Sequence, residues 1–236
     1  MPARVPLALL ALLFVLGSTL PRPASAKQLV VRCGQPRPPR VALTFDDGPH
    51  PRFTREILAI LKEHKVKATF FVLGGLARIF PQILREIEAQ GHLLANHSWN
   101  HPRTDTPDGW RTQIQRTQDV IRKAGAHPTQ YYRPPHGIVT PVVKQLATEL
   151  ALTIVLYTVL SSDWQGMKAE ALTQQVVKGL RPGGIVVLHD GGRNRTETVK
   201  AVPGIIKGLR EKGLEPVRLD ELLAAEAPDP KGCHRQ

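Results

Sequence analysis

Two adjacent carboxylates, Asp46 and Asp47, are the first residues in this chain whose types and position could support catalysis. They follow a short apolar run, residues 41–45, which is typical of a buried strand, and Gly48-Pro49 then turns the chain away. Two acids at the end of a core strand are costly unless something compensates their charge. The alternative is a pair of solvated turn aspartates, because Asp and Gly are common in turns.

A second group is the imidazole pair His97 and His101, four residues apart. If the segment turns helically, both rings face one way, which is a common spacing for gripping a metal. Alone, the spacing is a weak signal that surface histidines would also explain. With a carboxylate from another strand end, two nitrogens and one oxygen form a three-ligand set with an open position. Such a set suits a catalytic Zn²⁺, although Co²⁺ and Ni²⁺ share these ligands.

One aspartate would then bind the metal, and the other could take a proton from water that the metal has acidified. Arg133 could orient that base and keep it ionised. His189 is a second candidate for proton transfer, and Asp163 could fix its tautomer and raise its pKa. Each residue has a structural alternative, namely a salt bridge for Arg133, a loop for Asp163 and a helix cap for His189.

The elements that would position these residues alternate between strand and helix about seven times, which predicts a parallel sheet with right-handed crossovers. A barrel and an open doubly wound sheet both fit, and both place chemistry at the carboxyl ends of the strands. The chemically loaded residues do follow predicted strands. Strands are predicted at 41–45, 68–72, 92–96, 131–133, 153–159, 185–188 and 215–218. Helices are predicted at 53–64, 80–90, about 110–125, 142–150, 169–180, 196–212 (kinked or split at Pro203) and 219–225.

The 236 residues fit a single domain preceded by a signal peptide. Residues 1–26 combine a basic start, an apolar stretch too short to span a bilayer comfortably and a small-residue cleavage site. We predict that residues 27–40 form a linker, 41–225 the domain and 226–236 a tail. Cleavage would leave no stable membrane span, and the product would be secreted, periplasmic or associated with the cell envelope.

Export agrees with the cysteines, since Cys33 and Cys233 could join the two ends of the domain in an oxidising compartment. The formal charge is +12, or +10 once Arg4 and Arg22 leave with the signal peptide. That charge favours polyanionic surroundings. Because no basic block carries interleaved aromatics, an anionic cell envelope fits better than nucleic acid. No segment suggests an oligomer interface, so we expect a monomer.

The residues singled out above resemble those of the polysaccharide deacetylase family, the NodB-homology domain of carbohydrate esterase family 4. The five matching motifs follow one another in the family's order, across residues 41–190. They are Thr44-Phe45-Asp46-Asp47-Gly48, His97-Ser98-x-x-His101, Arg133-Pro134-Pro135-His136-Gly137, Asp163-Trp164 and Val187-Leu188-His189. The resemblance implies a distorted (β/α)₇ barrel.

The resemblance also implies a role for each matched residue. Asp47, His97 and His101 would hold the metal, Asp46 would be the base, and His189 the acid. Arg133 would orient Asp46, and Asp163 would tune His189. Pro135, His136, Trp164 and Leu188 would line the sugar and acetyl groove, with the backbone N–H of His136 facing the oxyanion. Three positions depart from the family pattern, namely His136 in place of Tyr, Leu160 in place of Asp and Val187 in place of Leu.

The implied reaction is hydrolysis of N-acetyl groups on an N-acetylglucosamine-type glycan, such as peptidoglycan, a chitin oligomer or an exopolysaccharide. Two alternatives stay open. An O-acetyl esterase of the acetylxylan type would use nearly the same site, because ester and amide hydrolysis share a tetrahedral intermediate. A catalytically silent glycan-binding relative would typically have lost a ligand or the base, and this sequence keeps them together.

Overall fold

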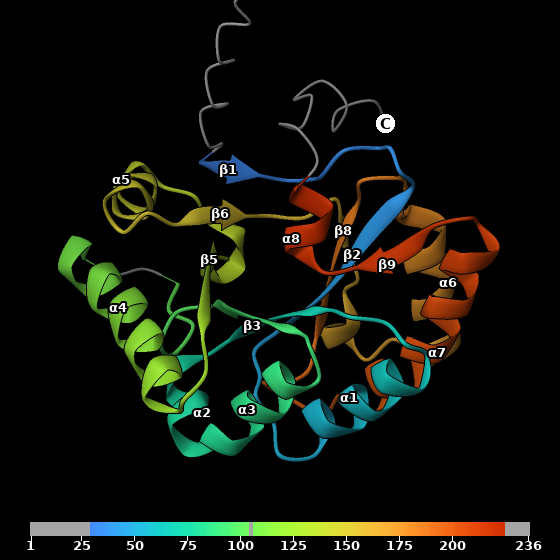
Figure 1. Ribbon diagram of the computed structural model, residues 1–236, viewed down its shortest axis with the longest axis horizontal. Helices are drawn as coiled ribbons and strands as arrows, with labels where there is room; N and C mark the ends of the chain where they lie inside the picture. Colours follow the sequence, from blue (N-terminus) through green and yellow to red (C-terminus); the bar gives the residue numbers. More distant parts are fainter. Residues whose placement is uncertain (1–28, 104–105, 225–236) are drawn as a thin grey trace, which may run out of the picture.

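A computed structural model describes residues 29–103 and 106–224 (Figure 1). Its strands are parallel wherever they pair, and they form one sheet in the order β1-β6-β5-β4-β3-β2-β8-β7, with β9 also pairing with β2. The strands are β1 (Val30–Val31), β2 (Arg40–Asp46), β3 (Thr69–Val72), β4 (Leu93–Asn96), β5 (Pro128–Tyr132), β6 (Thr153–Val155), β7 (Val159–Leu160), β8 (Ile185–His189) and β9 (Glu215–Val217).

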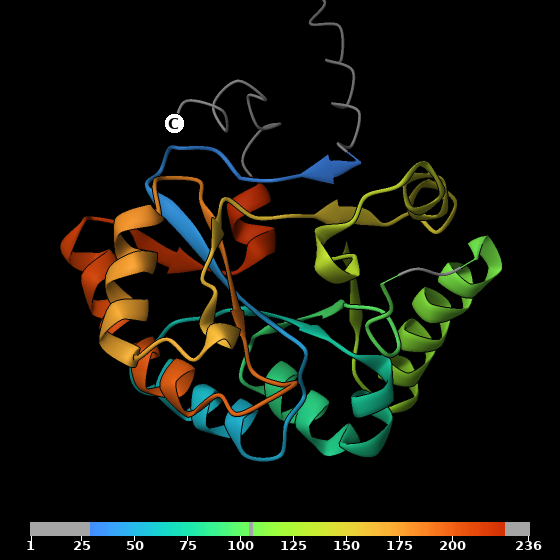
Figure 2. The ribbon, with the colours of Figure 1, turned by 180° about the vertical axis from the view of Figure 1, so that it is seen from behind.

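Helices cover the outside of the curled sheet, as Figures 1 and 2 show from opposite sides. In chain order they are α1 (Phe53–Glu63), α2 (Gly74–Ile79), α3 (Pro81–Ala89), α4 (Pro107–Lys123), α5 (Pro141–Glu149), α6 (Ala169–Gly179), α7 (Thr196–Glu211) and α8 (Leu219–Leu223), with short 3₁₀ turns at Pro135–Gly137 and Asp163–Gln165. The first helix shows why they dock: Phe53, Ile57 and Leu61 recur every four residues and are buried. The prediction of a distorted (β/α)₇ barrel is confirmed.

Alternation along the strands separates two environments. In β2, Val41, Leu43 and Phe45 pack outward into the core beneath the helices. Ala42 belongs instead to the core inside the barrel, and Thr44 and Asp46 continue that inward face. Because the period is two, one strand supplies an apolar residue at the bottom of the barrel and a carboxylate at its top.

The amino-terminal end of the barrel is closed by apolar side chains. Ala42 of β2 lies there beside Ile185 of β8 and Val217 of β9, and the same apolar cluster includes Leu219 and Leu222 of α8. This end therefore supplies packing, and the polar inward residues gather at the opposite, carboxyl end of the strands.

Four sequence predictions differ from the structure. The predicted linker contains β1, which pairs with β6, so this part of it belongs to the sheet. The predicted strand 153–159 is two strands, because β6 pairs with β5 whereas β7 pairs with β8 at the other end of the sheet order. Residues 74–79 form α2, where Gly74-Gly75 predicted only a strand end. Helix α7 is not split at Pro203.

The signal peptide, the tail and Cys233 lie outside the described residues, so the cleavage and the disulfide stay predictions. Cys33 is buried beside α8, where Gly34 approaches Leu222. Within residues 29–103 and 106–224, no helix is long and apolar enough to cross a membrane.

Candidate active site

The first part of the site is an ion pair at the end of β2. Asp46 is 3% exposed, and its Oδ1 accepts a hydrogen bond of 2.7 Å from Nη1 of Arg133. Arg133 follows β5, is itself buried, and also donates to the hydroxyl of Thr44 at 2.8 Å. Its guanidinium lies over the ring of Phe71, 4.0 Å from the centroid. Burial lowers the pKa of Arg133, and Asp46 raises it in compensation. The pair therefore fixes the carboxylate by one oxygen only.

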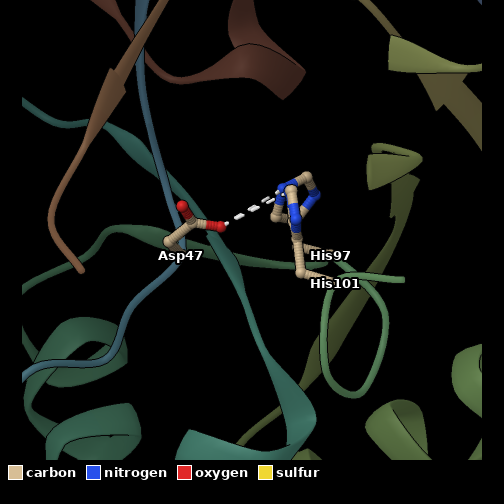
Figure 3. Close-up of side chains that lie close together, drawn as sticks. All are labelled: Asp47, His97 and His101. Atoms are coloured by element: carbon tan, nitrogen blue, oxygen red, sulfur yellow. Dashed lines mark ion pairs between the residues drawn. The ribbon is translucent and has the colours of Figure 1, made fainter. Parts of the chain in front are cut away.

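The second part is a cluster of three side chains from two strand ends, Asp47, His97 and His101, drawn in Figure 3. Oδ1 of Asp47 lies 3.6 Å from Nε2 of His97 and 3.7 Å from Nε2 of His101. Nδ1 of His97 is 2.7 Å from the carbonyl oxygen of Arg133, to which it donates when protonated. That bond would leave Nε2 as the lone-pair nitrogen facing the cluster.

These residues fit a divalent metal ion. Oδ1 of Asp47 is buried and has no hydrogen-bond partner among the described residues, which is costly for a carboxylate oxygen unless an ion meets it. Burial, with the neighbouring His97, lowers the pKa of His101 to about 4, so this ring is in the neutral form that binds metals. Asp47 and His101 both have positive φ, of 70° and 59°. Such strained backbone is often found where side chains must converge.

The loop that carries the two histidines is held by its backbone. The N–H groups of Trp99 and Asn100 both donate to Oε1 of Gln113 on α4, at 2.8 and 3.1 Å. Nε2 of Gln113 donates in turn to the side chain of Asn100, at 2.8 Å. The N–H of His101 donates to the hydroxyl of Ser98. Sequence reasoning missed Gln113, because nothing in the sequence links this position on a helix to a loop that precedes it.

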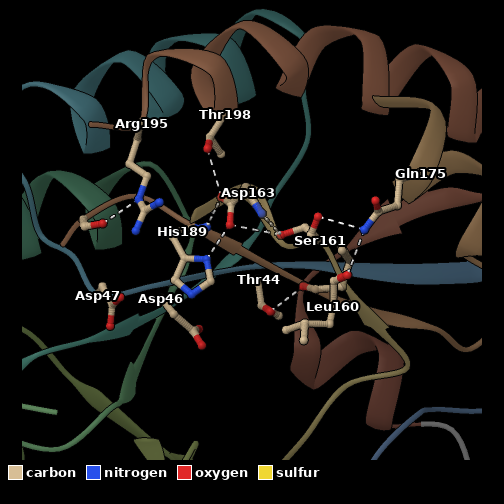
Figure 4. Close-up of polar contacts among 12 residues, drawn as sticks. Thr44, Asp46, Asp47, Leu160, Ser161, Asp163, Gln175, His189, Arg195 and Thr198 are labelled. Atoms are coloured by element: carbon tan, nitrogen blue, oxygen red, sulfur yellow. Dashed lines mark hydrogen bonds and ion pairs between the residues drawn. The ribbon is translucent and has the colours of Figure 1, made fainter. Parts of the chain in front are cut away.

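The third part is His189 at the end of β8, paired with Asp163 (Figure 4). Nδ1 of His189 lies 2.6 Å from Oδ1 of Asp163, and the backbone N–H of His189 donates to Oδ2 at 2.9 Å. Ser161 and Thr198 donate to the same carboxylate, at 3.1 and 2.9 Å. All of these contacts fix the imidazole with its Nε2 directed away from Asp163.

The pair shifts both pKa values toward the charged forms. Burial alone would lower the pKa of His189, but the hydrogen bond and charge of Asp163 raise it above its ordinary value. Burial alone would raise the pKa of Asp163, but His189 and then Arg195 lower it. His189 is thereby suited to carry and release a proton.

Two buried residues beside the site were not predicted to take part. Asp190 is fully buried and accepts a hydrogen bond of 2.5 Å from Thr54, and burial raises its pKa to about 7. Arg195 is also buried, and its Nε donates to the carbonyl of Gly191 at 2.7 Å. Asp190 directly follows His189, so its place after a strand was visible in the sequence, whereas Arg195 gave no such signal.

The three parts line one cleft of about 540 Å³ at the carboxyl ends of the strands. Of the predicted wall residues, His136 and Trp164 line it. Leu188 does not: it is fully buried in the core beneath the helices, because alternation along β8 turns Val187 inward instead. Pro135 is buried and is not among the lining residues, whereas its neighbour Pro134 is.

The sequence of this chain is similar to those of polysaccharide deacetylases. A family model described as "Polysaccharide deacetylase" matches residues 34–155. A peptidoglycan-N-acetylglucosamine deacetylase of Bacillus cereus is 37% identical over 185 residues, which are 77% of this chain and 67% of the relative. A chitooligosaccharide deacetylase of Sinorhizobium fredii is 37% identical over 190 residues, 74% of this chain and 87% of the relative.

Solved structures agree with the sequence matches. The crystal structure of a peptidoglycan N-acetylglucosamine deacetylase superimposes with a TM-score of 0.81 at 34% identity, over 86% of this chain and 96% of that one. A family 4 pseudoenzyme of Bacillus anthracis superimposes with a TM-score of 0.76 at 29% identity, over 82% of this chain and 68% of that one. Because an enzyme and a pseudoenzyme share this fold, activity has to be judged from the residues of the site.

Proposed function

The chain belongs to the polysaccharide deacetylase family, and we propose that it is an exported, metal-dependent enzyme that hydrolyses N-acetyl groups of an N-acetylglucosamine-type glycan. The observation that carries this proposal is the position of two proton-handling groups in one cleft. Asp46 and His189 both line it, and the cluster of Asp47, His97 and His101 lies beside Asp46. Amide hydrolysis needs a base for water, an acid for the amine and a centre that stabilises the oxyanion.

Asp46 supplies the base. Arg133 occupies its Oδ1, which leaves Oδ2 as the acceptor, and this oxygen lies 3.7 Å from Nε2 of the metal-cluster residue His97. A water held at the cluster would therefore be within reach of the free carboxylate oxygen. Arg133 offsets the charge of the carboxylate and prevents it from rotating.

His189 supplies the acid from the other wall. Figure 4 shows its ring between Asp163 on one side and Asp46 on the other. Because Nδ1 is engaged by Asp163, the proton that leaves toward substrate is on Nε2. His189 would protonate the departing amine, and the imidazole would be restored by the proton that Asp46 has taken from water.

Asp47, His97 and His101 would hold the metal, which we propose is Zn²⁺, with Co²⁺ or Ni²⁺ as alternatives for the same ligands. When bound, the ion supplies a Lewis acid for the acetyl carbonyl and lowers the pKa of water at the site. The backbone N–H of His136 is the second candidate for contacting the oxyanion, and His136 and Trp164 would flank the sugar and the acetyl methyl.

Two other functions are outcomes of the test. An O-acetyl esterase would need less from His189, because an alkoxide leaves more readily than an unprotonated amine. A catalytically silent glycan-binding protein is the second alternative, since one structural relative is a pseudoenzyme. Here the base, the acid and the cluster of metal-binding residues are all in place, which favours an enzyme.

The family relationship and the predicted signal peptide support a protein outside the cytoplasm that acts on an envelope glycan, either peptidoglycan or another N-acetylated polymer, and not on nucleic acid. We propose that the mature domain extends through residue 225 and is a monomer.

The test is acetate release from peptidoglycan, chitin oligomers and acetylated xylan, with Zn²⁺ and after chelation. We expect metal-dependent acetate from at least one N-acetylated glycan and none from an Asp46→Asn variant. Acetate from xylan alone would make the protein an esterase. No acetate from any substrate, with metal demonstrably bound, would favour the silent binder.

A further inference from the structure

The cleft carries more positive charge than the proposed catalytic residues require. Four arginines and two aspartates line it, so its formal charge is positive even before a metal adds to it. Both aspartates are committed, Asp46 to Arg133 and Asp47 to the metal cluster. The other arginines therefore have no carboxylate of the cleft left to neutralise them.

Two of these arginines, Arg103 and Arg193, are exposed at the rim. Within the part of the chain that the structure describes, neither forms an ion pair with an acidic side chain, whereas some other exposed arginines do, such as Arg52 with Glu56. An exposed, unpaired guanidinium beside a substrate cleft is free to bind a carboxylate of the substrate in the two-pronged way that suits this group.

The rim arginines come from loops on different sides of β2. Arg103 follows the metal loop after β4, and Arg193 lies in the loop after β8. In the sheet, β4 and β8 are separated by β3 and β2, so the two arginines border the cleft on either side of Asp46.

We propose that Arg103 and Arg193 are specificity-determining residues, and that the substrate is an acidic glycan with carboxylate groups on sugars next to the N-acetyl group that is removed. This inference rests on the proposed N-deacetylase function and narrows its substrate class. The inference favours one of the two substrate types named for the relatives. A chitin oligomer is uncharged, whereas a glycan with lactyl ether or peptide carboxylates is anionic. The arginines act on binding and on encounter, and take no part in bond cleavage.

The experiment compares one polymer in two charge states. Peptidoglycan glycan strands are assayed for acetate release before and after carbodiimide coupling of their carboxylates to methylamine, which removes the charge and keeps the sugars. The uncharged N-acetylglucosamine pentamer serves as a third substrate. Assays with the metal-loaded protein are run at low and at high salt, because exposed charge pairs weaken as ionic strength rises.

We expect kcat/KM to be about tenfold higher for the carboxylated strands than for the amidated ones at low salt, mainly through KM, since exposed pairs of this kind typically contribute a few-fold each. Arg103→Gln and Arg193→Gln should each reduce this ratio about threefold, and the double variant should bring it close to one. Arg40→Gln is the matched control, because it removes the same charge from an exposed residue at the opposite end of β2 and should leave the ratio unchanged.

Equal kcat/KM for the two charge states, or a preference that survives in the double variant, would overturn the inference and leave the N-deacetylase proposal intact. The same holds if only the pentamer is hydrolysed. No acetate from any of the three substrates would overturn both.

Discussion

The two walls of the cleft differ in how their polar atoms are satisfied. In the acid wall, formed by Asp163 and His189, the protein itself supplies the hydrogen-bond partners. Both oxygens of the Asp163 carboxylate accept hydrogen bonds, from His189, Ser161 and Thr198. The metal wall, formed by Asp47, His97 and His101, is not satisfied in this way. Oδ1 of Asp47 is buried without a hydrogen-bond partner among the described residues and faces two imidazole nitrogens. The acid wall is thus preorganised by protein alone, whereas Oδ1 of Asp47 in the metal wall has no such protein partner among the described residues.

This difference indicates which wall depends on a ligand from outside. A buried carboxylate with an unmet oxygen is destabilising unless something binds it, so a metal there should stabilise the fold as well as provide chemistry. The acid wall should keep its geometry whether or not a metal is bound. Single substitutions in each wall test whether the two walls are independent in this way.

Removing a ligand from the metal wall should have the largest effect. His97→Ala should abolish stoichiometric metal binding and lower kcat/KM for an N-acetylated glycan by on the order of 10³-fold or more, because the Lewis acid is lost with the ion. Metal content by elemental analysis and acetate release measure the two effects. Retention of one tightly bound metal per chain in the variant would show that the metal lies elsewhere.

Removing the acid should impair chemistry and spare the metal. His189→Ala should lower kcat for amide substrates by about 10² to 10⁴-fold, the usual contribution of a positioned proton donor, and should lower ester hydrolysis less. Its metal affinity should match that of the wild type, in contrast to His97→Ala. Equal losses for amide and ester would contradict the assignment of His189 as the donor to the leaving amine.

The sequence allowed much of this site to be predicted, because the relevant residues lie at or directly after the ends of strands and parallel strands align their carboxyl ends. Asp46, Asp47, His97, Arg133 and His189 all follow that rule. The prediction that Leu188 lines the cleft was wrong because it chose the wrong one of two neighbouring residues in β8. Side chains alternate along a strand, and in β8 Val187 faces the cleft while Leu188 faces the core beneath the helices. The split of strand 153–159 was hidden because both halves are β-branched, and the sequence does not reveal that they pair at opposite ends of the sheet order.

Contacts between distant parts of the chain could not be predicted at all. Gln113 on α4 reaches back to the loop that carries His97 and His101, and the buried Thr198 on α7 reaches back to Asp163. Such contacts depend on how a helix docks, which is set by packing of its buried face and leaves no local pattern.

Within the acid wall, Asp163→Asn should shift the pH dependence. Asp163 raises the pKa of His189, so the wild-type donor stays protonated to higher pH. A neutral amide removes that charge, and the alkaline limb of the kcat profile should therefore move to lower pH, while the rate at low pH falls less. A pH–rate profile measures this, and an alkaline limb that stays in place would indicate that another group is the acid.

The smallest effect is expected at the support of the metal loop. Gln113→Leu removes the acceptor of two backbone N–H groups and should weaken metal affinity about tenfold, a typical effect of residues behind metal ligands. Gln113→Glu keeps the acceptor and should retain most of the affinity. Gln115→Leu, at an exposed position of the same helix, is the control. Chelator competition with the apo protein measures the affinity, and identical values for Gln113→Leu and Gln115→Leu would contradict the support role.

The most direct test of the central claim is a metal titration. Chelated protein is titrated with Zn²⁺ while acetate release from an N-acetylated glycan is followed. We predict that activity rises to a plateau at one equivalent, with no rise for His97→Ala. Activity that survives chelation, or fails to appear when one equivalent is bound, would contradict the account.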